Sequence, residues 1–140
     1  LVVADLDGDG DQDLAFCEPG GFGVPGTIWV FAGDGKGGFT QAAALSHPGP
    51  AALAVADANG DGRPDLAVTS AVTSFATKPT PTLSFLFKGA GWTFASGDPQ
   101  GVVVGNTPVT VVASDLDGDG RADFVVGCPG DGTLHVLIGR

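Results

Sequence analysis

Short apolar runs separated by turn residues are the dominant pattern along this chain. Val, Leu, Ile and Phe recur in blocks of a few residues, and no longer stretch places its apolar residues at helical spacing. Alternating or β-branched runs of about four to eight residues bounded by Gly, Pro and Asp predict strands. We therefore predict an all-β fold without a helix of consequence.

Three copies of one acidic unit divide the chain. They begin at Asp5, Asp57 and Asp115, so successive copies start 52 and 58 residues apart. Each copy is expected to have a strand before the unit and another directly after it. Third strands are expected at 27–31, 82–87 and 133–138, and fourth strands, in the first two copies only, at 39–43 and 92–95.

Four short antiparallel strands repeated at about 50 residues are typical of a propeller blade. We predict blade 1 at residues 1–50, blade 2 at residues 51–108 and blade 3 at residues 109–140, the last without its fourth strand. A closed propeller usually needs about four or more blades, so we expect a partial or oligomer-completed β-propeller.

Each acidic unit is a nine-residue loop with glycine at its fourth and sixth positions. Alternate residues of such a tight loop point inward, which brings several side-chain oxygens together. Crowded carboxylates repel one another, and a hard divalent cation relieves this; Ca²⁺ fits better than Mg²⁺, which prefers water and a strict octahedron. We predict three Ca²⁺ sites, with the seventh residue of each loop contributing its main-chain carbonyl. Their residues are Asp5, Asp7, Asp9, Asp11 and Asp13 (loop one), Asp57, Asn59, Asp61, Arg63 and Asp65 (loop two), and Asp115, Asp117, Asp119, Arg121 and Asp123 (loop three).

The charge of the chain supports this interpretation. Its formal net charge is −10, and 12 of its 16 acidic residues lie in the three loops, so three bound Ca²⁺ ions would bring the charge to about −4. Ordinary Asp-Gly hairpin turns are the alternative, which three copies in identical register disfavour. Position twelve is Phe16, Val68 or Val126, so the bidentate Glu of an EF-hand is missing. Asn59 replaces one carboxylate, and we expect loop two to be the weakest site.

The loops resemble the FG-GAP/VCBS repeats of integrin-α-like β-propellers and of many secreted bacterial proteins. The resemblance rests on the three Asp-x-Asp/Asn-x-Asp-Gly-x-x-Asp-Leu/Phe motifs and covers essentially the whole chain. Segments 16–20 with Phe22-Gly23, and 126–130, look like degenerate forms of the family's Phe-Gly and Gly-Ala-Pro signatures. Copy two departs from the pattern, because 69–81 reads as an insertion. The resemblance implies four-stranded blades with structural calcium between the first two strands.

No residue pattern indicates an enzyme. His47 and His135 are the only histidines, and a surface or packing role is favoured for both. No nucleophile elbow, zinc-protease or phosphate-loop motif occurs. Six scattered Lys and Arg residues argue against nucleic acid, and no apolar run is long enough for a membrane span.

Other features leave alternatives open. Cys17 and Cys128 fall in copies one and three, so free thiols or a bond between chains are favoured over an intrachain disulfide. Segment 77–82 reads as an exposed loop, either a plain insertion or an O-glycosylated or partner-binding segment. The sequence opens without Met and closes directly after a strand-like run, which is expected where a longer chain is interrupted.

We expect a calcium-stabilised, non-enzymatic module of a secreted or cell-surface protein that serves as a scaffold or adhesive surface. Its partners would be other repeats of the same or a neighbouring chain, and a glycan or protein ligand. One alternative is a homo-oligomeric filament or ring assembled through the open edge of blade 3. Another is a carbohydrate-binding or lyase domain.

Overall fold

The computed structural model describes residues 1–21, 24–71, 80–97 and 101–140. Within these residues the chain forms strands and turns and contains no helix, which confirms the all-β prediction. The strands are β1 (Val2–Ala4), β2 (Asp13–Glu18), β3 (Gly26–Gly33), β4 (Phe39–His47), β5 (Pro50–Ala56), β6 (Asp65–Ser70), β7 (Thr82–Lys88), β8 (Phe94–Ser96), β9 (Val102–Val103), β10 (Thr110–Ser114), β11 (Asp123–Cys128) and β12 (Thr133–Leu137).

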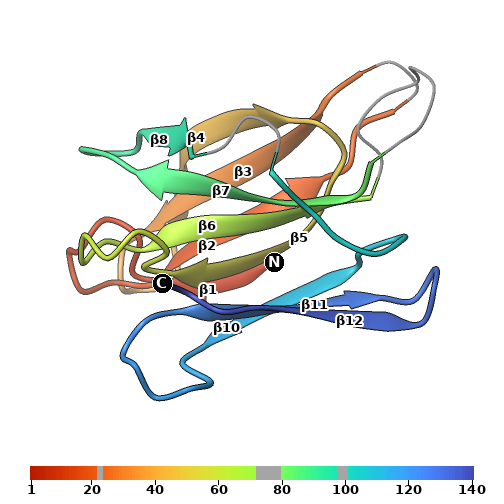
Figure 1. The fold of residues 1–140 in the computed structure, drawn as a ribbon. Coiled ribbons are helices and arrows are strands. Elements are labelled where there is room, and N and C mark those ends of the chain that lie inside the picture. Colours follow the sequence, from red (N-terminus) through yellow and green to blue (C-terminus); the bar gives the residue numbers. More distant parts are fainter. Residues whose placement is uncertain (22–23, 72–79, 98–100) are drawn as a thin grey trace.

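Three antiparallel sheets follow one another along the chain. The first has the order β1-β2-β3-β4, the second β5-β6-β7-β8 with β9 also paired to β7, and the third β10-β11-β12. Figure 1 shows them as three layers, with the second sheet between the other two. These are propeller-type blades in an open arrangement, and the third sheet has three strands, as expected. The second sheet differs from the expected four strands. In it, β8 pairs with the C-terminal end of β7, and a fifth strand, β9, pairs with the N-terminal end of β7.

Two apolar clusters hold the sheets together. Between the first and second sheets, Leu6, Ile28 and Val30 meet Leu66 and Val68. Between the second and third, a further cluster contains Ala54, Ala67, Leu83, Phe124 and Val126. Successive residues of a strand point to opposite faces. The middle sheet therefore buries both faces, and every residue of β6 is buried.

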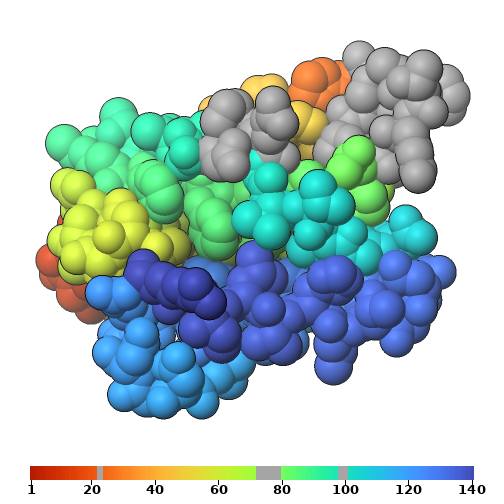
Figure 2. Space-filling view, viewed as in Figure 1, coloured from red at the N-terminus to blue at the C-terminus, as the bar shows by residue number. Residues whose placement is uncertain are grey.

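Each sheet has two faces that we name by their neighbours: the forward face points toward the next sheet along the chain, and the rear face toward the preceding one. Among the residues that the structure describes, no sheet packs on the forward face of the third sheet. Figure 2 shows the third sheet as an outer layer of the molecule, in blue. Large apolar residues exposed on that face are Val112, Leu134 and Val136.

The rear face of the first sheet also has no sheet packed on it within the described part of the chain. Val3 is 54% exposed there, while Phe16 and Phe31 stack with ring centroids 5.9 Å apart. Beside them, the indole N–H of Trp29 donates to Glu18 at 2.9 Å. The first sheet thus exposes its rear face to its surroundings, and the third sheet exposes its forward face.

The structure corrects the start of the predicted insertion at 69–81 and the end of the predicted exposed loop at 77–82. Thr69 and Ser70 belong to β6 and are buried, because they continue its pairing with β5 and β7. Thr82, the last residue of the predicted exposed loop and the first of the predicted strand at 82–87, begins β7 and is 6% exposed, so the strand prediction is confirmed there and the loop prediction is wrong. Residues 77–79 of that loop and the Phe22-Gly23 pair lie outside the described residues.

Candidate metal centres

The three acidic loops lie at the same end of the three sheets. Each joins the first two strands of its sheet: β1 to β2, β5 to β6, and β10 to β11. Figure 1 shows the loops at the left of the view, in red, yellow-green and blue. A repeated loop at a repeated place in the sheet gives the three sites one common geometry.

The first aspartate of each loop organises its backbone. In loop one, Asp5 accepts hydrogen bonds from the N–H groups of Gly8 at 2.7 Å and Gly10 at 3.0 Å. Asp57 and Asp115 accept the corresponding bonds in the other two loops. Both glycines of each loop have positive φ, between 77° and 96°, a conformation that residues with a Cβ resist. The glycines therefore let the chain curl around the first carboxylate.

The third and fifth positions follow the same scheme. Asp7 accepts from the N–H of Asp9 at 3.1 Å, and Asp9 accepts from the N–H of Asp11 at 2.8 Å. The same two bonds occur in loops two and three. Each of these side chains thus turns back over its own loop, which draws the oxygens together.

Carboxylate oxygens meet in loops one and three. Atoms of Asp5, Asp7 and Asp13 lie within 4.8 Å of one another, as do atoms of Asp115, Asp117 and Asp119. Desolvation, followed by the nearby charges of other loop-one carboxylates, raises the pKa of Asp7. An all-oxygen donor set of crowded carboxylates fits a hard cation such as Ca²⁺. Asp9 and Asp123 do not belong to these two groups.

Loop two offers less negative charge to a cation than the other two loops. Asn59 supplies a neutral oxygen, and its side-chain amide donates to Asp61 at 3.1 Å. The guanidinium of Arg63 also pairs with Asp61 at 2.7 Å, and this hydrogen bond is the main cause of the lowered pKa of Asp61. A cation in loop two would compete with Arg63 for that carboxylate; that this site is the weakest stays a prediction.

The ninth-position aspartates have a structural role that the sequence did not reveal. Asp13 is 1% exposed and accepts from the N–H of Leu6 at 2.7 Å and from that of Gly33 at 2.9 Å. Asp65 and Asp123 repeat this arrangement, each joining its loop to the chain at the end of the third strand. The period-two alternation of Asp13 with Ala15 and Cys17 is the signal that could have placed this carboxylate on the buried face.

The pKa values of two of these groups shift in opposite directions. Desolvation raises the pKa of Asp65, which lies in the middle sheet. In Asp123 the hydrogen bonds from Gly139 and Leu116 dominate and lower its pKa. A carboxylate oxygen has more than one lone pair, so accepting from an N–H still leaves capacity to bind a cation. Both roles are compatible at the ninth position.

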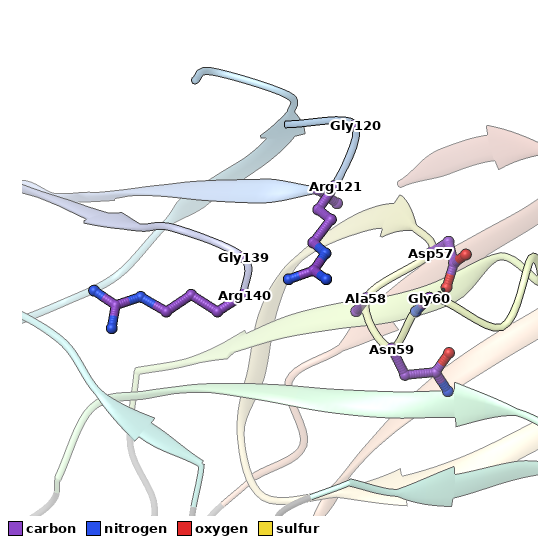
Figure 3. A pocket seen from close by; sticks show the side chains of 9 residues that line it. Asp57, Ala58, Asn59, Gly60, Gly120, Arg121, Gly139 and Arg140 are labelled. Carbon is purple, nitrogen blue, oxygen red and sulfur yellow. Dashed lines mark hydrogen bonds between the residues drawn. The ribbon is translucent and has the colours of Figure 1, made fainter. Parts of the chain in front are cut away.

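The main-chain carbonyls of the seventh-position residues stay predicted ligands. The side chains of these residues make other contacts or point in other directions. The carboxylate of Asp11 lies against the turn between β3 and β4, where a Cβ added at Gly35 would meet its oxygen. Arg63 pairs with Asp61, as described above. Arg121 turns toward loop two (Figure 3).

One histidine and the two cysteines that the sequence singled out lie outside the acidic loops. His47 is 7% exposed, and its Nδ1 lies 3.4 Å from the hydroxyl of Ser70, so the predicted packing role fits its position. Cys17 and Cys128 are free thiols. Burial raises the pKa of Cys17 to about 11 and also raises that of Cys128. Because Cys128 is only 1% exposed, a bond from it to another chain would require rearrangement.

Comparison with known proteins is consistent with this geometry. A family model described as an FG-GAP-like repeat matches residues 3–68, and one described as an FG-GAP repeat matches residues 107–137. Phosphatidylinositol-glycan-specific phospholipase D of Mus musculus is 29% identical over 150 residues, covering 92% of this chain. The chain spans only 18% of that relative's length. Among the described residues, no helix has the length and hydropathy that a membrane crossing requires.

Proposed function

This chain belongs to the FG-GAP repeat family, and from this we propose that it is a calcium-stabilised extracellular module that acts as a scaffold or binding surface. One observation carries the proposal: three loops at the same end of three sheets repeat the same backbone hydrogen bonds to their first, third and fifth side chains. This arrangement gathers carboxylates in loops one and three, and in loop two it turns the side-chain oxygens of Asp57, Asn59 and Asp61 over the backbone. Extracellular calcium is millimolar, so even weak sites of this type would be filled.

Calcium would stabilise the fold because it binds the closed loop and not the unfolded chain. Saturating calcium, at about 100 times the dissociation constant, is worth about 2.7 kcal/mol per site. We expect isothermal titration calorimetry to show calcium binding, and the melting temperature to fall when EDTA is added. Magnesium at the same concentration is the matched control and should stabilise much less. A melting temperature that is identical in calcium and EDTA would contradict the proposal.

We propose no catalytic role for the module. Phospholipase D activity is a property named for the mouse relative, of which this chain matches a small part. His47 contacts the hydroxyl of Ser70, but the two residues are only 7% and 1% exposed, so the pair is closed to a substrate. His135 lies in β12. We expect no hydrolysis of phosphodiester substrates by the purified chain; turnover that disappears in a His47→Gln variant would refute this.

A second candidate function is self-assembly, which the exposed forward face of the third sheet favours. Leu134 and Val136 are 73% and 56% exposed there, and β12 is the outer strand of that sheet. Within the chain, forward faces pack on rear faces, so the same contact between copies would be head to tail and would give a ring or filament. The apolar side chains favour contact through the face as well as through the edge of β12.

Sedimentation velocity over a range of protein concentrations tests this assembly. We expect concentration-dependent oligomers that Val136→Lys disperses. Val103→Lys is a matched control, because Val103 is 64% exposed on β9, away from the forward face. A wild-type protein that stays monomeric at every concentration, or equal effects of the two variants, would rule out assembly through this face.

A further inference from the structure

A cleft of about 560 Å³ lies between loop two and loop three. One wall is residues 57–60 of loop two, and the other is residues 120–122 of loop three with residues 139–140. Figure 3 shows the side chain of Arg121 extending from loop three toward Ala58 and Asn59. The cleft therefore has a guanidinium group on one wall and a polar, small-residue wall opposite.

The two arginines of the cleft are unpaired. Within the described residues, the guanidinium groups of Arg121 and Arg140 make no ion pair or hydrogen bond, and both side chains are exposed. Arg63, at the same loop position as Arg121, instead pairs with Asp61 of its own loop. Arg121 is thus a free anion-binding group at a place where its counterpart is already neutralised.

Asp57 is the one acidic residue among those that line the cleft. Its carboxylate accepts hydrogen bonds from the backbone N–H groups of Gly60, Asp61 and Gly62, so it is turned into its own loop. Asn59 leaves a neutral side chain where the other two loops carry aspartate. Both features reduce the repulsion that an entering anion would meet.

The lining also limits the chemistry of a ligand. It contains no aromatic or large aliphatic side chain, only Gly, Ala and the polar residues already named. A ligand of this size would bury little apolar surface and would depend on charge and hydrogen bonds. The open glycine backbone favours hydroxyl-rich groups over the apolar side chains of a peptide.

We propose that this cleft binds an acidic saccharide, with Arg121 holding a carboxylate or sulfate group by a charge-assisted, two-pronged contact. Arg140 lines the same wall, but its side chain extends away from loop two (Figure 3), so it adds positive charge only at longer range. The inference deepens the binding-surface part of the proposed function. Loops two and three together carry seven carboxylates, and with Arg63, Arg121 and Arg140 they leave four negative charges that two Ca²⁺ ions would neutralise. Binding of the saccharide should therefore be stronger when calcium is bound.

Isothermal titration calorimetry with defined hexasaccharides tests the site. The probes are a hyaluronan hexasaccharide, which carries carboxylates, a carrageenan hexasaccharide, which carries sulfates, and uncharged maltohexaose. We expect the calcium-loaded chain to bind at least one acidic probe and not maltohexaose; the tighter acidic probe identifies the anionic group. Arg121→Ala should weaken binding by at least about tenfold, because the charged bidentate contact is lost.

Lys36→Ala is the charge-matched control, since Lys36 is an exposed cation in the turn between β3 and β4. It should leave the affinity within about twofold. Thermal melts in calcium verify that both variants are folded. The proposal is overturned if the calcium-loaded chain binds neither acidic probe, if Arg121→Ala binds as well as the wild type, or if both variants lose affinity equally.

Calcium titrations of the same samples separate this proposal from the calcium sites. Calcium binding without acidic-saccharide binding would refute the cleft alone. Saccharide binding that depends on Arg121 but not on calcium would support the cleft and refute its coupling to the loops. An acidic hexapeptide that binds in place of either saccharide would overturn the assignment of the ligand class.

Discussion

Replacement of Asp13 by Asn gives the sharpest test of how the loops are joined to the sheets. The carboxylate of Asp13 is 1% exposed, and its two oxygens accept from the N–H groups of Leu6 and Gly33 at 2.7 and 2.9 Å. Asn keeps one oxygen and presents an NH₂ group in place of the other. One of the two backbone N–H groups would then face a donor and lose its acceptor.

The size of the effect follows from these contacts. A buried donor without a partner costs about 1–3 kcal/mol, and a hydrogen bond to a charged group is worth about 1.5–3 kcal/mol. These two costs partly describe the same loss and are not added in full. We therefore expect Asp13→Asn to lower the free energy of unfolding by about 3 kcal/mol. For a chain of this length that corresponds to a melting temperature roughly 10 °C lower.

Urea unfolding followed by tryptophan fluorescence measures this loss, once in EDTA and once in calcium. Asp7→Asn is the matched control, because Asp7 is an exposed member of the same loop. In EDTA we expect the control to change stability by less than about 0.5 kcal/mol. In calcium it should lose stability as well, since a predicted ligand is weakened.

The two variants therefore have different signatures. Asp13→Asn should be destabilised under both conditions, and Asp7→Asn in calcium only. A loss below about 1 kcal/mol for Asp13→Asn in EDTA would show that the two N–H groups do not depend on the carboxylate. The ninth-position aspartate would then be a metal ligand and nothing more.

Three further substitutions test other parts of the structure. Asn59→Asp should tighten calcium binding at loop two by about tenfold, measured by calorimetry, because it restores a charged ligand. Burial lowers the pKa of His47, so the unfolded chain takes up the proton at a higher pH than the folded chain does. Stability should therefore fall as the pH drops below about 6.5. In urea unfolding of His47→Gln, the free energy of unfolding should depend less on pH between about pH 7 and 5. Lys88 is 5% exposed, and its ammonium lies 5.6 Å from two aromatic ring centroids. Urea unfolding of Lys88→Met should show a free energy of unfolding about 2 kcal/mol lower. For exposed Lys36→Met the loss should be less than about 0.5 kcal/mol.

The fold could be predicted because its signals are local. Alternating runs bounded by glycine turns are a short-range pattern, and the expected strands at 27–31 and 133–138 appear as β3 and β12 within a residue or two at each end. The loop geometry is equally local, since the bonds from Asp5 to Gly8 and Gly10 span only three to five residues. Repetition of the same spacing three times strengthened both predictions.

What the sequence did not show depends on contacts between distant segments. The N–H of Gly33 lies 20 residues from the Asp13 carboxylate that it bonds, and no spacing rule connects them. The cleft likewise forms only because residues 57–60, 120–122 and 139–140 come together from three different segments. Strand β9 also escaped prediction, because the three consecutive valines 102–104 stand between two glycines and form a run shorter than the usual strand signal.

Position two of the loops shows why the uncovered faces matter. Leu6 is 1% exposed because it packs between the first and second sheets, whereas Leu116, at the same position of loop three, is 53% exposed. The same side chain at the same repeat position is thus buried where a following sheet covers it and exposed where none does. Leu6→Ala should therefore cost about 3 kcal/mol in urea unfolding through the cavity that it leaves. Leu116→Ala should leave the stability of the monomer within about 0.5 kcal/mol and weaken the association of copies measured by sedimentation. Equal losses of monomer stability would mean that Leu116 already has a packing partner, and the forward face of the third sheet would then not be free for a second copy.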